Sequence, residues 1–269
     1  MPQISLLGCG WLGLPLAEAL LKEGCTVKAS TTSPEKLEKL EASGLHPYLV
    51  TLSEIGISGS IHDFLEGTAV LIIDIPPKLR GEGKENFTAK IKNLVPEIEK
   101  AVIKKVLFVS STSVYAEVAH FPIVTEETPP DPDSEAGRQL LEAEQLLQDC
   151  KSFKTTVLRF GGLVGEDRHP IKFLAGRKNI ENPLGPINLI HRKDCIGIIL
   201  KIIKEDIFGE TFNAVAPVHP GRQDYYTKKA LAFGLPAPAF SLEKQSAGKI
   251  IDSRKLMEVL DYQFHAELL

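Results

Sequence analysis

The stretch Ile4-Ser5-Leu6-Leu7-Gly8-Cys9-Gly10-Trp11-Leu12-Gly13 decides which fold we expect. An apolar run predicts a short buried strand, and three glycines with the spacing G-x-G-x-x-G follow it directly. In such a turn Gly8 permits the sharp bend, Gly10 lets a pyrophosphate approach the backbone, and Gly13 lets the next helix pack closely. The N–H groups and the dipole at the start of that helix hold phosphate groups. The stretch therefore predicts a dinucleotide-binding turn.

The strand–helix alternation continues from this stretch as far as Phe160. Beyond Ile4–Leu7, we expect strands over Thr26–Ala29, Tyr48–Leu52, Val70–Ile75, Val106–Ser110 and Thr156–Phe160. We expect helices over Trp11–Glu23, Pro34–Ser43, Asn86–Val102 and Glu135–Cys150. Most of these strands are continuously apolar, which is typical of a parallel sheet with helices on both faces. The predicted fold class is α/β, a doubly wound parallel sheet of the Rossmann type.

Glycines and prolines become frequent after Phe160, which indicates a loop-rich second part. We expect residues 1–160 to form the NAD(P)-binding domain, with 187–214 returning to it. Residues 161–186 and 215–269 should form a smaller C-terminal lobe that binds substrate. The elements expected after Phe160 are a helix over Asp194–Lys204, a strand over Thr211–Ala214 and a helix over Ser253–Leu260.

The composition excludes several classes of protein. Apolar residues make up 43% and charged residues 25%, as in ordinary globular proteins, and the net charge of -4 provides no basic surface for nucleic acid or anionic membrane. The four cysteines form no Cys-x-x-Cys pair, so neither a metal site nor a disulfide framework is expected. No signal peptide or membrane-length apolar run is visible. We expect a cytoplasmic protein with a small-molecule substrate.

The end of the second expected strand bears on the choice of cofactor. NAD-dependent proteins usually carry an acidic residue there, which binds the ribose 2′-hydroxyl and repels a 2′-phosphate. This chain reads Ala29-Ser30-Thr31-Thr32-Ser33-Pro34-Glu35-Lys36, with no acid before Glu35. Hydroxyl groups, backbone N–H groups and Lys36 could accept the phosphate, so NADP(H) is favoured over NAD(H). Alternatively, Ser33 simply caps the helix that begins at Pro34, and both interpretations can hold together.

Four segments in this order resemble the extended short-chain dehydrogenases/reductases of the NAD-dependent epimerase/dehydratase family. They are Gly8–Gly13, the strand Val106–Ser110 running into Ser111-Thr112-Ser113-Val114-Tyr115, Leu158–Gly165 and Asn188–Asp194. The resemblance covers nearly the whole chain. The Gly8–Gly13 opening and the pair Pro76-Pro77 are most similar to an atypical, YeeZ-like subgroup of small epimerase-like proteins.

The resemblance implies an oxidoreductase or epimerase chemistry that this chain alters. Relatives use a serine to orient the substrate and a Tyr-x-x-x-Lys pair as acid and base. The serine position matches Ser111, but the tyrosine and lysine positions hold Ala136 and Leu140. Glu144 stands where relatives often carry a glutamate, which supports this register.

Motif positions identify the expected binding residues. Those expected to bind cofactor are Gly8, Gly10, Trp11, Leu12, Gly13, Thr31, Thr32, Ser33, Lys36, Ile75, Pro76 and Ser110. Pro76 could equally belong to a simple turn that binds no ligand.

Other polar residues could act on the substrate. Arg159 and Arg168 are candidates for binding a phosphorylated or carboxylated substrate, the alternatives being a buried pair for Arg159 and surface solvation for Arg168. His191 is a candidate acid or base, the alternative being that it fixes a loop through hydrogen bonds. Tyr115 is expected to be a buried aromatic residue with a satisfied hydroxyl group.

Two functions remain open on these residues. The first is an NADP(H)-dependent enzyme of altered mechanism acting on a small polar or nucleotide-linked substrate. The second is a catalytically inactive sensor or regulator that binds NADP(H) and acts through partner contacts. The oligomeric state stays open as well. Relatives commonly form dimers through the helices that correspond to Asn86–Val102 and Glu135–Cys150, which makes a homodimer one candidate.

Overall fold

The computed structural model describes residues 2–77 and 85–265. Its contacts divide the chain into two compact units. Unit 1 comprises Met1–Ser111, Ser134–Leu158 and Ile199–Thr211, and unit 2 comprises Thr112–Asp133, Arg159–Ile198 and Phe212–Leu269. Residues 112–133, 159–160, 187–198 and 212–214, which we assigned to the dinucleotide-binding domain, thus cluster with unit 2. The domain boundaries themselves stay a prediction.

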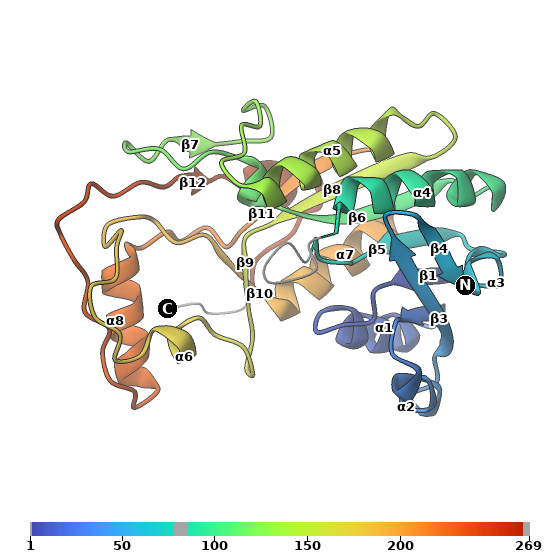
Figure 1. Cartoon of the computed structure of the whole chain (residues 1–269), viewed down its shortest axis with the longest axis horizontal. Helices are drawn as coiled ribbons and strands as arrows, with labels where there is room; N and C mark the ends of the chain where they lie inside the picture. The colour runs from blue at the N-terminus through green and yellow to red at the C-terminus, as the bar shows by residue number, and fades with distance from the viewer. Residues whose placement is uncertain (1, 78–84, 266–269) are drawn as a thin grey trace. The chain divides into compact units, whose positions relative to one another are not determined.

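An eight-stranded sheet has the strand order β11-β8-β6-β5-β1-β2-β3-β4 (Figure 1). The strands are β1 (Gln3–Leu7), β2 (Thr26–Thr31), β3 (His46–Ser53), β4 (Gly56–Gly59), β5 (Val70–Ile73), β6 (Lys105–Ser111), β8 (Lys154–Phe160) and β11 (Thr211–Ala214). β1 pairs in parallel with β2 and β5, and the neighbouring pairs β2–β3 and β5–β6 are also parallel. The predicted α/β fold with a mostly parallel sheet is confirmed.

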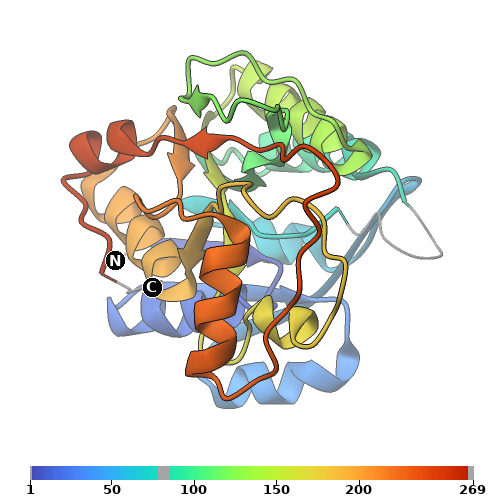
Figure 2. The same cartoon turned by 90° about the vertical axis from the view of Figure 1, so that its left-hand side faces the viewer.

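Helices cover both faces of this sheet. They include α1 (Gly13–Lys22), the 3-10 turn η1 (Pro34–Lys36), α2 (Leu37–Ala42), α3 (Ile61–Leu65), α4 (Phe87–Lys100), α5 (Glu135–Asp149) and α7 (Arg192–Glu205). Figures 1 and 2 show α1 and α2 on one side of the strands and α4 beside α5 on the other. Every side chain of Val70–Ile73 is consequently buried, which explains why this strand is continuously apolar.

Side-chain caps explain where the two longest helices of unit 1 begin. The Asn86 side chain accepts a hydrogen bond from the Ala89 N–H at 3.0 Å, and Ser134 Oγ accepts one from the Gly137 N–H at 3.1 Å. These bonds satisfy N–H groups that have no acceptor inside the helix. The helices predicted over Asn86–Val102 and Glu135–Cys150 are confirmed to within two residues at each end.

The structure differs from the predictions at several places in unit 1. Helix α3 was not predicted, and the single helix expected over Pro34–Ser43 is divided into η1 and α2. The first helix begins at Gly13 rather than Trp11, because Trp11 and Leu12 belong to the glycine-rich turn. The strand predicted to reach Ile75 ends at Ile73. β4 was not predicted, because a short glycine-bounded segment becomes a strand only by pairing antiparallel with β3.

Unit 2 contains short elements around its own core. They include η2 (Thr112–Val114), β7 (Ile123–Val124), β9 (Gly162–Val164), α6 (Ile171–Leu174), β10 (Leu189–His191), α8 (Arg222–Ala232), β12 (Ile250–Ile251) and α9 (Arg254–Val259). β9 pairs with β10 and β12 pairs with β7, both in parallel. Ile171, Tyr225 and Tyr226 contribute to the buried core of α6 and α8.

In the part of the chain that the structure describes, no helix has the length and apolarity needed to cross a membrane.

Candidate functional site

The glycine-rich turn borders a cleft of about 270 Å³ that lies entirely within unit 1. Its lining comes from the carboxyl ends of β1, β2, β3 and β5 and from the segments that follow them. The lining residues are Leu7, Gly8, Cys9, Gly10, Ser30, Thr31, Thr32, Lys36, Val50, Leu52, Asp74, Ile75, Pro76 and Lys90. Ligands of open α/β sheets bind at this edge of the strands.

The three glycines of the turn meet different constraints. Gly8 has a φ of +110°, and a Cβ atom there would lie 2.2 Å from the Asp74 carbonyl oxygen. A Cβ on Gly13 would lie 2.2 Å from the Gly8 carbonyl oxygen, so helix α1 touches the turn at this point. Apart from its two chain neighbours, no atom of residues 2–77 and 85–265 lies within 4 Å of a Cβ built on Gly10. Gly8 and Gly13 are thus needed by the fold, whereas Gly10 leaves open space in the cleft.

Backbone hydrogen bonds shape the turn for an anionic group. The Gly8 N–H donates to Ser30 Oγ at 2.9 Å, and the Cys9 N–H donates to the Ser30 carbonyl oxygen at 3.0 Å, so β2 braces the turn. Among residues 2–77 and 85–265, the N–H groups of Leu12 and Gly13 find no acceptor. Unsatisfied N–H groups at the start of a helix suit a phosphate. Gly8, Cys9 and Gly10 of the same turn line the cleft, so a phosphate bound there would lie beside this turn.

The end of β2 presents hydroxyl groups and a lysine to the cleft, with no acid between Ser30 and Pro34. Thr31 Oγ1 accepts a hydrogen bond from the Ser33 N–H at 3.1 Å, so this hydroxyl holds the local turn. Thr32 and Lys36 line the cleft and are exposed. Ser33 does stand at the N-cap of η1, but its side chain makes no capping hydrogen bond, so the expected side-chain cap is wrong.

Three polar residues of the cleft were missed by the sequence analysis. Asp74 follows β5, and burial raises the pKa of its carboxyl group to about 8. Burial, with the Asp74 charge adding to it, raises the pKa of the Cys9 thiol to about 11. The largely buried Lys90 of α4 forms an ion pair with Glu85. An acid directly after an apolar strand was the available signal for Asp74, whereas nothing local marked Cys9 or Lys90.

Helix α5 carries the buried Glu144, whose carboxylate contacts β6. Ser110 Oγ donates to Glu144 Oε1 at 2.5 Å, and both residues are buried. Leu140 is also buried on α5, while Ala136 is partly exposed. The Ser110 hydroxyl, which we expected to contact a cofactor, therefore already has a carboxylate partner.

The glycine-rich turn and nearly all of the cleft lie in a stretch that matches a known family. The sequence profile of the family described as NAD(P)H-binding matches residues 8–206, a range that includes the turn and all lining residues except Leu7. The chain belongs to this family. It is 34% identical to Protein YeeZ of Escherichia coli strain K12 over 266 residues, which cover 98% of this chain and 96% of the relative. The predicted YeeZ-like membership is confirmed.

Solved structures share the family's fold at lower identity. UDP-N-acetylglucosamine 4-epimerase from Bacillus cereus matches with a TM-score of 0.79 at 18% identity, covering 100% of this chain and 96% of that chain. UDP-glucose-4-epimerase from Stenotrophomonas maltophila, with bound NAD and formylated UDP-arabinopyranose, matches with a TM-score of 0.80 at 16% identity, covering 100% and 95%. The fold is that of NAD-dependent epimerases, and the chain is an NAD(P)-binding protein.

Two residues of the family landmarks form a buried pair in unit 2. Tyr115 is 2% exposed, and its hydroxyl group accepts a hydrogen bond from Arg159 at 2.6 Å and donates to Asn213 Oδ1 at 3.0 Å. The expectation of a buried, satisfied tyrosine is confirmed. Arg159 forms a buried pair with Tyr115, which was the alternative to a role in substrate binding. That role stays a prediction.

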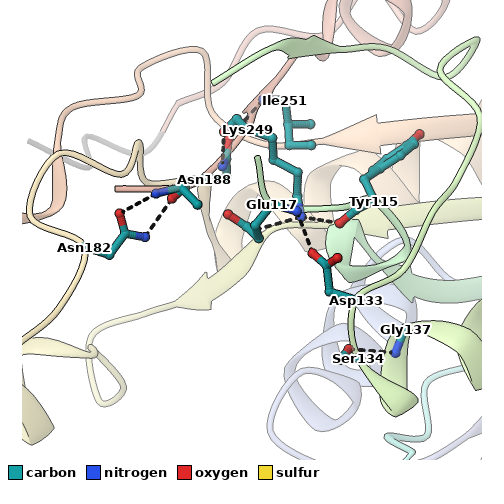
Figure 3. Close-up of polar contacts among 10 residues, drawn as sticks. Tyr115, Glu117, Asp133, Ser134, Gly137, Asn182, Asn188, Lys249 and Ile251 are labelled. Atoms are coloured by element: carbon teal, nitrogen blue, oxygen red, sulfur yellow. Dashed lines mark hydrogen bonds and ion pairs between the residues drawn. The ribbon is translucent and has the colours of Figure 1, made fainter. Parts of the chain in front are cut away.

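A buried lysine supports the segment that carries Tyr115, as Figure 3 shows. Lys249 is 3% exposed, and its Nζ donates to the Tyr115 carbonyl oxygen at 2.6 Å and to Glu117 Oε1 at 2.8 Å. Asn188 holds the segment Lys249–Ile251 in place. Its side chain donates a hydrogen bond to the Lys249 carbonyl oxygen and accepts one from the Ile251 N–H. A buried ammonium group needs such partners. The sequence analysis missed Lys249, which lies 134 residues from Tyr115.

The two remaining candidates lie at charged surfaces of unit 2. His191 Nδ1 accepts a hydrogen bond from the Lys193 N–H at 3.2 Å at the start of α7, and its Nε2 lies 3.9 Å from Glu166 Oε2. These contacts fit the alternative in which His191 fixes a loop. Arg168 is exposed, as surface solvation requires. Catalysis by His191 and substrate binding by Arg168 stay predictions.

Proposed function

We propose that the chain binds NADP(H) in preference to NAD(H) in the cleft of unit 1. It acts on a small polar or nucleotide-linked substrate, with an active site that lacks the tyrosine–lysine pair of its relatives. The observation that carries the cofactor preference is the end of β2, where Thr32 and Lys36 line the cleft and no carboxylate stands before Glu35.

The cofactor preference follows from charge. An acid at the end of β2 would accept a hydrogen bond from a 2′-hydroxyl and repel a 2′-phosphate. The Lys36 ammonium group instead attracts that phosphate, and the Thr32 hydroxyl can donate to it. Because both side chains are exposed, water screens the attraction and the preference should be moderate.

The order of residues on the face of α5 that bears Glu144 supports our proposal that the tyrosine–lysine pair is missing. Glu144 accepts a hydrogen bond from Ser110, next to Ser111 on β6. Residues four apart lie on the same side of a helix, so Leu140 and then Ala136 precede Glu144 along this face. Neither alanine nor leucine can hold or move a proton. Ser111 then remains to orient a substrate oxygen, without the usual acid and base.

The substrate class comes from the similar solved structures, whose names refer to UDP-sugars. Because identity to them is low, their substrates are the first class to test. The nicotinamide cofactor supplies hydride transfer when bound. None of the four cysteines, all of which the structure describes, forms a disulfide, and this fits the cytoplasmic location that we expect.

Two experiments test the proposal. The first is a pair of parallel calorimetric titrations with NADP and NAD. The second measures NADPH consumption with a panel of nucleotide sugars and small polar metabolites. We expect NADP to bind more tightly than NAD and at least one of these substrate classes to be turned over slowly. Tighter binding of NAD would contradict the cofactor preference. Binding without turnover across the panel, together with a partner protein that responds to NADP, would point to the sensor instead.

A further inference from the structure

Asp74 is a carboxylic acid placed against the phosphate-binding turn. Its N–H donates to the Leu7 carbonyl oxygen at 2.8 Å, so the backbone is held beside β1. A Cβ built on Gly8 would lie 2.2 Å from the Asp74 carbonyl oxygen, and one built on Gly13 would lie 3.3 Å from Asp74 Oδ2. The backbone of Asp74 therefore lies against the first glycine of the turn, its carboxyl group lies beside the last glycine, and the residue also lines the cleft.

A charged carboxylate at this position would oppose the cofactor. The N–H groups of Leu12 and Gly13, which suit a phosphate, belong to the same turn. Two like charges a few ångströms apart repel strongly where water is partly excluded. Within the described part of the chain, no hydrogen-bond or ion-pair partner compensates a negative charge on the Asp74 side chain.

The charged and titratable groups near Asp74 come from four other parts of unit 1. Cys9 follows β1, Lys36 belongs to η1, and Lys90 belongs to α4; all three line the cleft. Lys90 pairs with Glu85, and Lys36 is exposed, so neither forms an ion pair with Asp74. Glu18 of α1 acts with Asp74 to raise the pKa of Cys9, which keeps that thiol neutral. Burial raises the pKa of Asp74 to about 8, so the acid is protonated near neutral pH.

We propose that Asp74 is a cofactor-binding residue that meets the pyrophosphate as a neutral acid and donates its proton in a hydrogen bond to a phosphate oxygen. Dinucleotide affinity is then lost when Asp74 ionises. This inference rests on the proposed use of the cleft for the cofactor. It concerns the pyrophosphate, which NAD and NADP share, and is therefore independent of which of them binds more tightly.

The test is calorimetric titration of NAD and NADP from about pH 6.5 to about pH 9.5 with the wild type, Asp74→Asn and Asp63→Asn. Wild-type affinity should fall about tenfold per pH unit above about pH 8 for both dinucleotides, because binding then requires uptake of a proton. Asp74→Asn keeps a neutral donor and should bind with little pH dependence. Asp63 is an exposed acid outside the cleft, and its variant should follow the wild type.

Infrared difference spectroscopy of the cofactor-free protein provides a second readout. The carbonyl band of a protonated carboxyl group should disappear in the wild type as the pH rises through about 8, and Asp74→Asn should lack this change. A wild-type affinity that does not change with pH, or the same slope in Asp74→Asn, would overturn this inference alone. Failure of both dinucleotides to bind at any pH would overturn it together with the proposed function.

Discussion

The physical reason for a glycine differs among Gly8, Gly10 and Gly13. Gly8 needs its positive φ, and Gly13 needs the missing side chain because the Gly8 carbonyl oxygen occupies that space. Gly10 has open space around it, so only a ligand would require it to be glycine. Substitutions can therefore separate the demands of folding from those of cofactor binding.

Gly10→Val should remove dinucleotide binding, weakening it at least about 100-fold, because the side chain occupies the approach of the pyrophosphate. The melting temperature should stay near that of the wild type. Gly13→Ala is the matched control and should destabilise the protein by about 1–3 kcal/mol through overpacking. Thermal unfolding and calorimetry measure both effects, and unchanged affinity in folded Gly10→Val would contradict the assignment of the cleft.

Lys36→Met should weaken NADP binding about tenfold, the loss of one charge-assisted contact, and leave NAD binding unchanged. The matched control is Lys39→Met, since Lys39 is an exposed lysine of α2 outside the cleft lining. Side-by-side titrations of both cofactors measure the ratio. Equal losses for NAD and NADP would show that Lys36 does not contact the 2′-phosphate.

At the scale of elements, a buried histidine joins α6 to α8. His169 Nδ1 accepts a hydrogen bond from the Ile171 N–H at 3.1 Å. The ring hydrogen is therefore assigned to Nε2, which lies 3.0 Å from the Tyr225 hydroxyl group and can donate to it. Burial lowers the pKa of His169 to about 4, with Lys229 and Lys172 adding to the effect. The contact between these helices thus requires a neutral imidazole.

Stability should fall as the pH drops from about 6.5 to about 4. In this range the unfolded state binds a proton at His169 that the folded state does not, so the free energy of unfolding decreases on acidification. The contribution is on the order of 3 kcal/mol. His169→Gln should lose this part of the acid sensitivity in thermal unfolding curves, whereas the exposed His120→Gln should retain it. Equal acid sensitivity in both variants would refute the assignment.

For the whole molecule, cofactor binding and catalysis have different requirements. In the proposed function, the glycine-rich turn of unit 1 binds the phosphates of the cofactor, while Ala136 and Leu140 occupy the positions of the acid–base pair of relatives. Dinucleotide binding can therefore persist without the ordinary reaction. The candidate homodimer also belongs to this scale and stays open.

Turnover of common nucleotide sugars should be slower by about 10²–10⁴-fold than in relatives with the tyrosine–lysine pair, because general acid–base help is missing. Ser111→Ala should lower any residual turnover further while leaving NADP affinity within about twofold, since the hydroxyl group orients substrate. Steady-state rates and titrations on the same preparations check this. Robust activity that survives Ser111→Ala would place the chemistry elsewhere in the chain.

The sequence by itself determined the strand–turn–helix of the cofactor site, because glycine spacing and apolar runs are local properties with one favourable backbone solution. It also located Thr32 and Lys36, which follow β2 directly. Only the tertiary structure decided that the partly buried Asp74 side chain lines the cleft beside the glycine-rich turn and that buried Lys249 supports the Tyr115 segment. Burial and pairing of these polar groups depend on residues distant in the chain. No local pattern records such contacts, so folding alone brings them together.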